Sequence, residues 1–473
     1  MFCPANRIRL IIVVWLLACT SVVQAKTITV MQDGSGGFEL IQPALDAAAS
    51  GDTILIGPGE YLDSQSMELQ GYPGPAEVFA FIPVSDLTII GAGKLETFIG
   101  PITYEGSGLT YSPIGIRWID GATLKVCGIT IRNCFDGLQA GGGVIFIDDC
   151  NILDNSYGIY WSTEGSGGWI TNCNVSSSVP GGPTGLYLVG SGSDVVVEEC
   201  LFDGAMISVK NLENISIIGC EIRNMVVGLQ VDNGTHCYVE DCRINNCVNV
   251  GISLAPPAST CEIIESEVSS EGVAVKVHSY GELVATNSIF NGGGWAVFEF
   301  NSANEAQVSN CQLFPGDGPA IRSYRHPSYG EVVHDLRNNF WGTIDGDEIR
   351  SLILDGIEDP DNTSTVLFEP FVSGLSSTDI PQPMGNLSIH PNPFNPRTTI
   401  SFSIDHPQNV ELCIFDMTGK RIAILADRSF QAGDHSIDWQ GIDLHGRAVA
   451  SGSYLLRMIT DDGVKPEKMM LVR

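Results

Sequence analysis

Basic residues are scarce in this sequence. Its 473 residues include 24 Lys and Arg against 55 Asp and Glu, a formal net charge of −31. Such an acidic surface repels nucleic acid and anionic membranes. We therefore expect no nucleic-acid partner. Beyond the N-terminal segment, no apolar run is long enough to span a membrane. The repeated central part of the chain contains no helical stripe of useful length, and Cys and His show no spacing suited to zinc. The acidic balance suits an exported protein or one that holds cations.

The N-terminus has the pattern of an export signal. Arg7 and Arg9 precede the apolar run "LIIVVWLLA" at 10–18, and small residues lead up to Ala25. This order predicts a signal peptide over 1–25 that is cleaved after Ala25. The stretch "LLAC" at 16–19 leaves open the alternative of a lipoprotein with a lipid on Cys19.

One short motif recurs along the middle of the chain. "EDCRINNC" begins at residue 240, "DDCNILDN" at 148, "TNCNVSSS" at 171 and "SNCQLFPG" at 309. A fixed period of 20–30 residues is typical of a solenoid, in which each repeat buries its apolar face only against its neighbours. The position of the central cysteine recurs about every 23 residues, at Gly128, Cys150, Cys173, Cys200, Cys220, Cys242, Ser266, Ser288 and Cys311.

Within each repeat the hydrophobic pattern has a period of two. "IFIDDCNIL" and "CYVEDCRIN" alternate polar with small or apolar residues, and a second short strand such as "GLQV" or "AVKV" follows about eight residues later. Gly, Asn, Asp and Ser occupy the corners. The pattern therefore predicts a coil of short parallel strands, with the cysteine and the residue two places later pointing inward.

Cysteine is plentiful, with 14 residues in the chain. The cysteines of the repeat are expected to stay as buried thiols, because stacked rungs hold their Cβ atoms further apart than a disulfide prefers. Cys237 and Cys261 lie five residues before the repeat position on neighbouring rungs. They form the best candidate for a disulfide.

The two ends of the coil carry a resemblance to a known family. "VMQDGSGGFELIQPALDAAASGDTILIGPGEYLD" at 30–63 resembles the entry of right-handed parallel β-helix proteins of the pectate-lyase-like superfamily, in which a short helix caps the coil. "NNFWGTIDGDEIRSLILDGIEDPDNTSTVLFEPF" at 338–371 resembles their closing segment. The resemblance implies a capped right-handed parallel β-helix over residues 26–375.

The last part of the chain differs in pattern. After a linker over 376–386, residues 387–473 alternate strands with turns, as in "PNPFNP", "DMTGK" and "DWQGIDLHG". These phrases resemble the C-terminal sorting domain of type IX secretion substrates, which has an immunoglobulin-like fold. The resemblance implies an all-β chain in which residues 387–473 engage outer-membrane secretion machinery. It also implies that the protein is secreted or located at the cell surface. The alternative is that residues 387–473 form an ordinary accessory β-sandwich.

The catalytic motifs of the superfamily are missing. The sequence lacks the "DFIFG" and "LGRPW" motifs of pectin methylesterases, the set typical of polygalacturonases and the R-x-P-x-x-R context of pectate lyases. The pair Asp148–Asp149 sits in a turn column that also holds Asn172, Glu199 and Asn310, so a structural role explains it better than acid–base chemistry. No catalytic residue is therefore assigned.

An outward surface of the second strand is a candidate for sugar binding. Aromatic rings stack on sugars, and polar groups bind their hydroxyls. A solvated sheet face of mixed composition is the alternative. The candidate residues are Tyr160, Tyr187, Lys210, Gln230, Asp232, Lys276, His278, Phe298 and Arg322.

Calcium is a second candidate ligand. Asp241 and Glu265 occupy the same turn column on neighbouring rungs, and carboxylate oxygens suit a hard cation. Solvated acids are the alternative explanation, because no known calcium motif surrounds them.

Two functions remain open from the sequence. The first is a polysaccharide-binding or structural surface protein, which the missing catalytic motifs favour. The second is a polysaccharide lyase or glycoside hydrolase acting on acidic glycans through an unusual site, so the sequence does not decide whether the protein is an enzyme.

Overall fold

The computed structural model describes residues 25–471 apart from 70–73, 104–111, 119–121, 166, 180–182, 193, 358, 360, 373–386, 393, 405, 417–420, 444–446, 451 and 461–462. Residues 1–24 of the predicted signal peptide, with the alternative at Cys19, and the linker 376–386 lie outside these residues. No helix in the described part is long and apolar enough to cross a membrane. The chain divides into two compact units, Met1–Ser216 and Ile217–Arg473.

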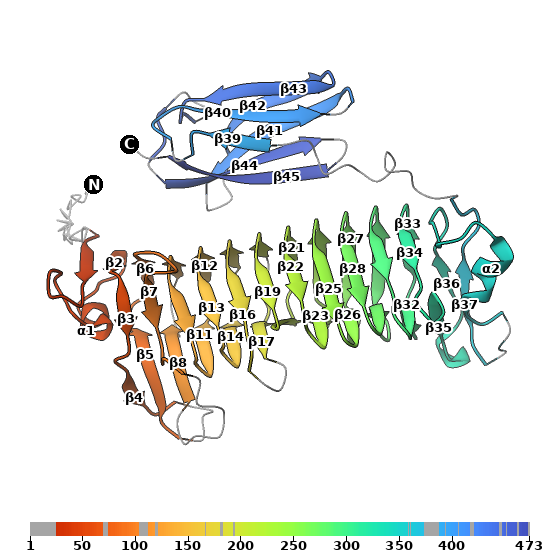
Figure 1. Cartoon of the computed structure of the whole chain (residues 1–473), viewed down its shortest axis with the longest axis horizontal. Helices are drawn as coiled ribbons and strands as arrows, with labels where there is room; N and C mark the ends of the chain where they lie inside the picture. Colours follow the sequence, from red (N-terminus) through yellow and green to blue (C-terminus); the bar gives the residue numbers. More distant parts are fainter. Residues whose placement is uncertain are drawn as a thin grey trace, which may run out of the picture. The chain divides into compact units, whose positions relative to one another are not determined.

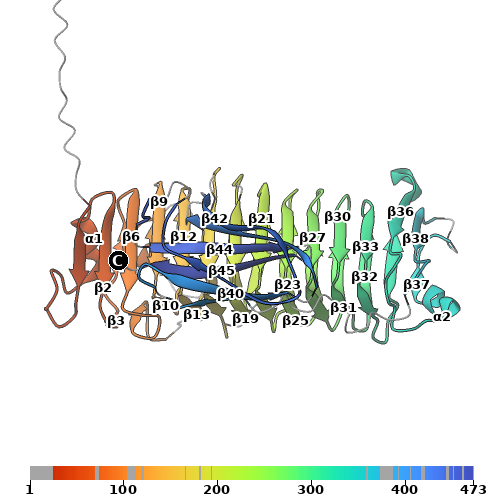
Figure 2. The same ribbon diagram turned by 90° about the horizontal axis from the view of Figure 1, so that it is seen from above.

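Three sheets, parallel except for one antiparallel pair at an end of the third, form the coil, and Figures 1 and 2 show their strands stacked side by side within each unit. Sheet 1 has the order β1 (Thr27–Val30), β2 (Asp52–Ile56), β6 (Asp86–Gly91), β9 (Thr123–Cys127), β12 (Val144–Asp148), β15 (Gly168–Thr171), β18 (Val195–Glu198), β21 (Asn214–Ile218), β24 (His236–Glu240), β27 (Thr260–Ile264), β30 (Glu282–Thr286), β33 (Ala306–Ser309), β36 (Val332–Asp335) and β38 (Ser364–Leu367).

Sheets 2 and 3 complete each turn of the coil. Sheet 2 has the order β3 (Gly59–Tyr61), β7 (Thr97–Ile99), β10 (Thr130–Arg132), β13 (Asn151–Leu153), β16 (Asn174–Ser176), β19 (Leu201–Asp203), β22 (Glu221–Arg223), β25 (Arg243–Cys247), β28 (Glu267–Ser270), β31 (Ile289–Asn291) and β34 (Gln312–Phe314). Sheet 3 has the order β4 (Gln65–Met67), β5 (Ala76–Ile82), β8 (Ser112–Trp118), β11 (Asp136–Gly141), β14 (Tyr157–Ser162), β17 (Thr184–Val189), β20 (Met206–Lys210), β23 (Val227–Asp232), β26 (Val250–Leu254), β29 (Val273–Val277), β32 (Ala296–Asn301), β35 (Ile321–Tyr324) and β37 (Ile353–Leu354).

Parallel pairing in register places like residues above one another inside the coil. In the second unit Val239 pairs with Ile263, which pairs with Ala285, and all three are fully buried. Since strands are about 4.8 Å apart, each inward side chain packs on its counterpart in the next rung and excludes water. The predicted right-handed parallel β-helix is confirmed.

The repeated polar column is a corner of the coil. Its residues adopt the left-handed backbone conformation, which Asn and Asp tolerate best among residues other than glycine. Cys242 and Ile244, the apolar pair of the motif, are buried inside, whereas Asp241 before them is exposed. Asp149 of the acidic pair occupies this corner, and Asp148 accepts hydrogen bonds from Thr171 and Asn172 on the next rung. The column comprises Asp149 (φ 51°), Asn172 (54°), Glu199 (52°), Asp241 (50°), Glu265 (50°), Asn287 (53°) and Asn310 (54°).

At several corners, a side chain of the next rung accepts the backbone N–H that follows the left-handed residue. The N–H of Cys242 donates to Ser266 Oγ at 3.1 Å, and the N–H of Ser266 donates to Ser288 Oγ at 3.1 Å. A thiol serves in the same way, because the N–H of Cys220 donates to Cys242 Sγ at 3.4 Å. The hydroxyl of Ser266 also donates to the carbonyl of Ile264 at 2.8 Å. The column therefore selects small side chains that both accept and donate.

The cysteines are thiols, as expected for the repeat column. The predicted Cys237–Cys261 disulfide is wrong, because both residues are free and buried although they pair in register on β24 and β27. Strands about 4.8 Å apart hold stacked Cβ atoms beyond the roughly 3.8 Å that a disulfide prefers. The hydrogen bond with the neighbouring Cys261, and then burial, raise the pKa of Cys237, which keeps the thiol protonated and unreactive.

Short helices close the two ends of the coil. Helix α1 (Ile41–Asp46) packs against β1, β2 and β5 through Ile41, Ala44 and Leu45. Helix α2 (Gly346–Ser351) begins at Asp345, whose carboxylate accepts the N–H of Asp347 at 2.9 Å and that of Glu348 at 3.2 Å. A one-turn 3₁₀ helix, η1, covers Pro327–Tyr329. Covered ends prevent other chains from pairing with the edge strands.

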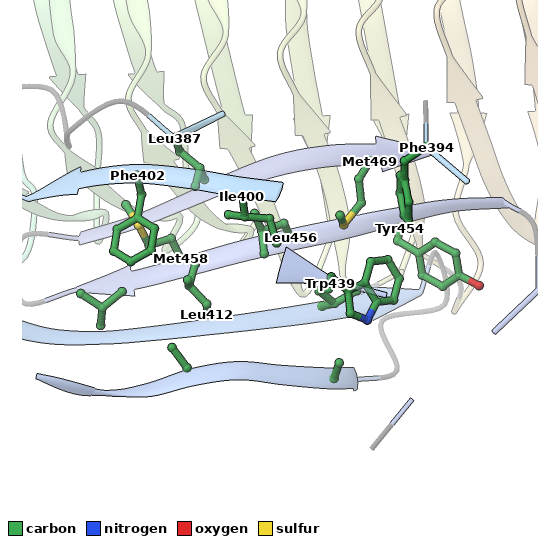
Figure 3. Packing of buried hydrophobic residues seen from close by; sticks show 14 of the residues in the cluster. Leu387, Phe394, Ile400, Phe402, Leu412, Trp439, Tyr454, Leu456, Met458 and Met469 are labelled. Carbon is green, nitrogen blue, oxygen red and sulfur yellow. The ribbon is translucent and has the colours of Figure 1, made fainter. Parts of the chain in front are cut away.

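The C-terminal module is a separate antiparallel sandwich. Its buried side chains, including Phe402, Trp439 and Leu456, come from both of its sheets (Figure 3). The described part therefore has its own hydrophobic core, as predicted for a β-sandwich. One sheet has the order β39 (Leu387–His390), β40 (Thr398–Ile404) and β43 (Gly433–Trp439), and the other β42 (Arg421–Phe430), β41 (Gln408–Asp416), β44 (Gly452–Thr460) and β45 (Gly463–Leu471).

The corner hydrogen bonds generate a stability prediction at Ser266. Ser266→Val should lower the free energy of unfolding by roughly 1–3 kcal/mol, because the buried N–H of Cys242 loses its acceptor. Ser266→Cys is the matched control and should cost less, since thiols fill the same column on other rungs. Urea unfolding of the three proteins measures this, and equal stability of wild type and the valine variant would contradict it.

Buried His334 generates a prediction on pH. Burial, reinforced by the charge of Arg325, lowers the pKa of His334 to about 4, and its ring stacks on Phe300 at 4.4 Å. An unfolded histidine has a pKa of about 6.5, so between pH 6.5 and 4 only the unfolded chain takes up this proton. The stabilisation is present above pH 6.5 and is lost as the pH falls towards 4, by roughly 3 kcal/mol.

Denaturant unfolding at pH 7 and pH 4.5 checks this value. His334→Phe keeps an aromatic ring against Phe300 and removes the titrating group, so the variant should lose clearly less stability on acidification than the wild type. Identical pH dependence of the two proteins would show that His334 does not contribute.

Candidate functional site

A column of polar side chains follows the outer face of sheet 3 in the second unit. Lys276 on β29 pairs with Glu299 on β32, which pairs with Arg322 on β35. Towards the N-terminus, Gln230 on β23 pairs with Ser253, and Ser253 pairs with Lys276. These residues project outward because their neighbours along each strand fill the core.

Trp295 stands at the C-terminal end of this face. It follows three glycines between β31 and β32, and 52% of its surface is exposed. A side chain at Gly293 would collide with the backbone carbonyl of Glu271, so only glycine lets this turn approach the preceding rung. The close approach fixes where the turn ends and where Trp295 leaves the coil.

The indole of Trp295 is held by two neighbours. Its Nε1–H donates to Glu299 Oε2 at 2.7 Å, and the guanidinium of Arg322 lies over the ring at 4.3 Å from its centre. Arg322 Nε also donates to the carbonyl of Trp295 at 3.0 Å. An exposed ring so fixed is a rigid platform that loses little entropy when a ligand binds.

Two ion pairs neutralise most of the acids here. Lys276 Nζ lies 2.8 Å from Glu299 Oε1, on the side of the carboxylate away from the indole. Arg350 binds Asp355 through two nitrogens, at 2.7 and 3.3 Å. Asp355 also accepts the N–H of Val366 at 2.9 Å, which ties this pair to the closing segment.

These residues enclose a cleft of about 540 Å³, a size typical of ligand sites. Tyr324 lines it with 46% of its surface exposed, so two accessible rings face one opening. Strands β32 and β35 supply one side, and the closing segment supplies the other. We call it the Trp295 cleft; its lining residues are Trp295, Glu299, Phe300, Asn301, Arg322, Ser323, Tyr324, Arg350, Ile353, Leu354, Asp355, Asp359 and Asn362.

His278 lies next to this column and is half-buried. Burial and then the charge of Lys276 lower its pKa, while Glu299 and Asp232 act in the opposite direction. The imidazole is therefore mostly neutral at pH 7 and can accept a proton. Asp232 is buried and accepts two contacts of 3.1 Å from the amide of Gln230.

The first unit brings together the other three predicted residues. Tyr160 and Tyr187 stack with ring centres 5.2 Å apart, and Lys210 Nζ lies 5.5 Å from the centre of the Tyr187 ring. Tyr157 packs edge-on against both rings. Burial, followed by the neighbouring Tyr187, raises the pKa of Tyr160. The stacked faces contact each other, so these rings offer mainly their edges to a ligand.

Phe298 is wrongly placed among the outward residues. It is fully buried and packs against Phe290 and Phe300, with ring centres 4.8 and 5.9 Å apart. The residue that takes its predicted place is Glu299, 23 residues after Lys276 and 23 before Arg322. The repeat period of 23 residues predicts that Glu299 points outward. The apolar residues of "AVFEF" gave no clear alternation, so Phe298 was chosen instead. Trp295 was missed because it belongs to a turn.

Asp241 and Glu265 line a second, smaller cleft of about 310 Å³ in the second unit. Glu221 and Glu267 also line it, together with Arg243, whose Nε lies 3.3 Å from Glu267 Oε2. Among the described residues, no group of three or more His, Cys, Asp or Glu is arranged to hold a metal ion. Calcium binding stays a prediction that these contacts do not test.

Two families match parts of the chain. Residues 105–314 match the right-handed β-helix region, and residues 388–472 match the secretion system C-terminal sorting domain. No curated protein gives a significant match. The chain is a right-handed parallel β-helix repeat protein with a type IX secretion sorting domain, which directs it to the cell surface or the medium.

Solved structures resemble the chain only distantly. A surface component of the type IX secretion system of Porphyromonas gingivalis is 21% identical, over 19% of this chain and 12% of that one, with a TM-score of 0.15. The mannuronan C-5 epimerase A-module of Azotobacter vinelandii is 12% identical, covering 71% and 94%, with a TM-score of 0.46. A tailspike protein of an E. coli bacteriophage is 9% identical, covering 94% and 93%, with a TM-score of 0.35. This chain thus spans about an eighth of the secretion component.

Proposed function

We propose that this exported protein binds polysaccharide through the Trp295 cleft. The observation that carries the proposal is the pair of exposed rings, Trp295 and Tyr324, lining one opening. Sugar rings present flat C–H faces that pack on aromatic rings, and their hydroxyls need donors and acceptors at the edge. Arg322 and Asn301 supply such groups in the same cleft.

The surroundings of the two rings favour a binding role. Trp295 is held in place by Glu299 and Arg322, so the platform exists before a ligand arrives. Exposed apolar surface that polar residues surround is typical of ligand-binding grooves. Export to the cell surface or the medium brings the cleft into contact with extracellular glycans.

Tyr160, Tyr187 and Lys210 are proposed as a separate contact on the first unit. Their hydroxyl and ammonium groups can bind sugar hydroxyls at the edge of the stack. Because the stacked faces already contact each other, this contact should contribute less affinity than the Trp295 cleft.

A glycan panel tests the proposed function with the full-length protein. Trp295→Ala and Tyr324→Ala should each weaken retention on the bound polysaccharide about 10-fold or more, because truncating a central aromatic contact typically costs more than 1 kcal/mol. Leu95→Ala is the control, since Leu95 is 79% exposed on the other unit and should retain wild-type affinity. Unchanged retention in both aromatic variants, with thermal unfolding intact, would reject the Trp295 cleft as the site.

Depolymerisation is a second candidate function, and the environment of His278 favours it. A neutral imidazole beside the Lys276–Glu299 pair could serve as a general base, a role that typically accelerates reactions 10²–10⁴-fold.

Measuring reducing ends and ultraviolet absorbance after incubation with the same panel at pH 7 separates the two functions. An enzyme should form products, and His278→Ala should reduce the rate at least 100-fold while retention stays unchanged. Retention without products would leave binding as the function.

A further inference from the structure

The guanidinium of Arg322 has more N–H donors than its contacts within the protein use. Of its five N–H groups, the one on Nε donates to the carbonyl of Trp295, and one face of the group covers the indole. Within the described part of the chain, Arg322 forms no ion pair. The N–H groups on its two terminal nitrogens form the flat fork that binds carboxylate or sulfate oxygens in pairs.

Two of the three carboxylates that line the Trp295 cleft are neutralised by ion pairs, and the third, Asp359, keeps its negative charge. Glu299 is neutralised by Lys276, and Asp355 by Arg350. Asp359 is exposed, and its carboxylate accepts the N–H of Asp361 within the closing segment. The cleft therefore offers a single positive centre without an ionic partner, in a protein whose formal net charge is −31.

This arrangement discriminates by charge density. One anionic group opposite Arg322 gains charge-assisted hydrogen bonds. A polymer with a charge on every sugar would gain the same bonds once, and its remaining charges would face an acidic protein within a Debye length of about 10 Å. Repulsion thus grows with each added charge, whereas attraction does not.

We propose that the Trp295 cleft selects glycans that carry an isolated anionic group, either a uronic-acid carboxylate or a sulfate ester, and rejects polyanionic chains. The anion binds the fork of Arg322 while neighbouring neutral rings pack on Trp295 and Tyr324. The inference rests on the proposed function, because it names the class of polysaccharide that the same cleft binds.

An array of matched glycans tests this with the full-length protein. Heteropolysaccharides with one uronic acid per repeat are printed native and after carboxyl reduction, and sparsely sulfated glycans are printed native and after desulfation. Polygalacturonate and heavily sulfated dextran represent polyanions, and neutral glucans and xylans complete the array. Comparing the carboxyl-reduced glycans with the desulfated glycans shows whether the bound anion is a carboxylate or a sulfate. Removing the isolated anion should weaken binding roughly 10- to 100-fold, and the polyanions should bind more weakly than the sparsely charged glycans.

Variants locate the effect at Arg322. Arg322→Gln should bind native and carboxyl-reduced forms equally, and Arg322→Lys should recover only part of the preference, because an ammonium lacks the planar fork. Arg337→Gln is the matched control, since Arg337 is exposed and paired with Asp335 outside the cleft. Thermal unfolding of each variant reports whether the fold is retained.

The outcomes separate the two proposals. Equal binding of native and anion-free forms, or strongest binding to polygalacturonate, would overturn the charge selectivity and leave glycan binding standing. Absence of binding to every glycan would reject the proposed function, and the inference with it. Loss of the preference in Arg322→Gln but not in Arg337→Gln is the result that supports it.

Discussion

The parallel hydrogen bonding between successive rungs is the constraint on which the rest of this protein depends. It fixes a spacing of about 4.8 Å, so every side chain meets its counterpart one repeat away. Inside the coil this favours stacks of Ile, Val and Leu. At the corner it requires a side chain that accepts the N–H left free by the left-handed residue, as Ser266 does for Cys242. Outside the coil, charges of one sign stacked at this distance would repel, and Lys276, Glu299 and Arg322 alternate in sign.

The same constraint explains why the fold could be predicted from the sequence. A solenoid repeats its interactions at a fixed interval, so each further copy of a corner motif such as "EDCRIN" supports the structure predicted from the first. The caps were predictable because residues 30–63 and 338–371 resemble the end segments of known β-helix proteins. The predicted disulfide between Cys237 and Cys261 is wrong for a geometric reason. The two residues pair in register, but stacked strands hold their side chains further apart than a disulfide requires.

The candidate site was predicted only in part, because binding residues need not obey the repeat. Lys276 and Arg322 lie on strand positions that a period of two identifies, and His278 directly follows β29 at the same period. Phe298 was misplaced because a strand with buried residues on consecutive positions, "AVF", gives no clear alternation. Trp295 belongs to a glycine-rich turn and Arg350 to the closing segment, and neither has a counterpart in other rungs. Their meeting in one cleft depends on how the coil ends, which no repeat specifies.

The end of the coil is also where a specific site can form without disturbing the packing between regular rungs. A regular rung presents a nearly flat, self-similar face, and any change to it must suit the rungs on both sides. At β35 the next rung is replaced by the short strand β37 and the closing segment, which can rise above the sheet and form a wall. Asp355 anchors this wall by binding Arg350 and the N–H of Val366, and the wall leaves Tyr324 and Arg322 open on one side. The regular coil thus supplies a rigid floor, and the irregular closing segment supplies the shape that a selective ligand site requires.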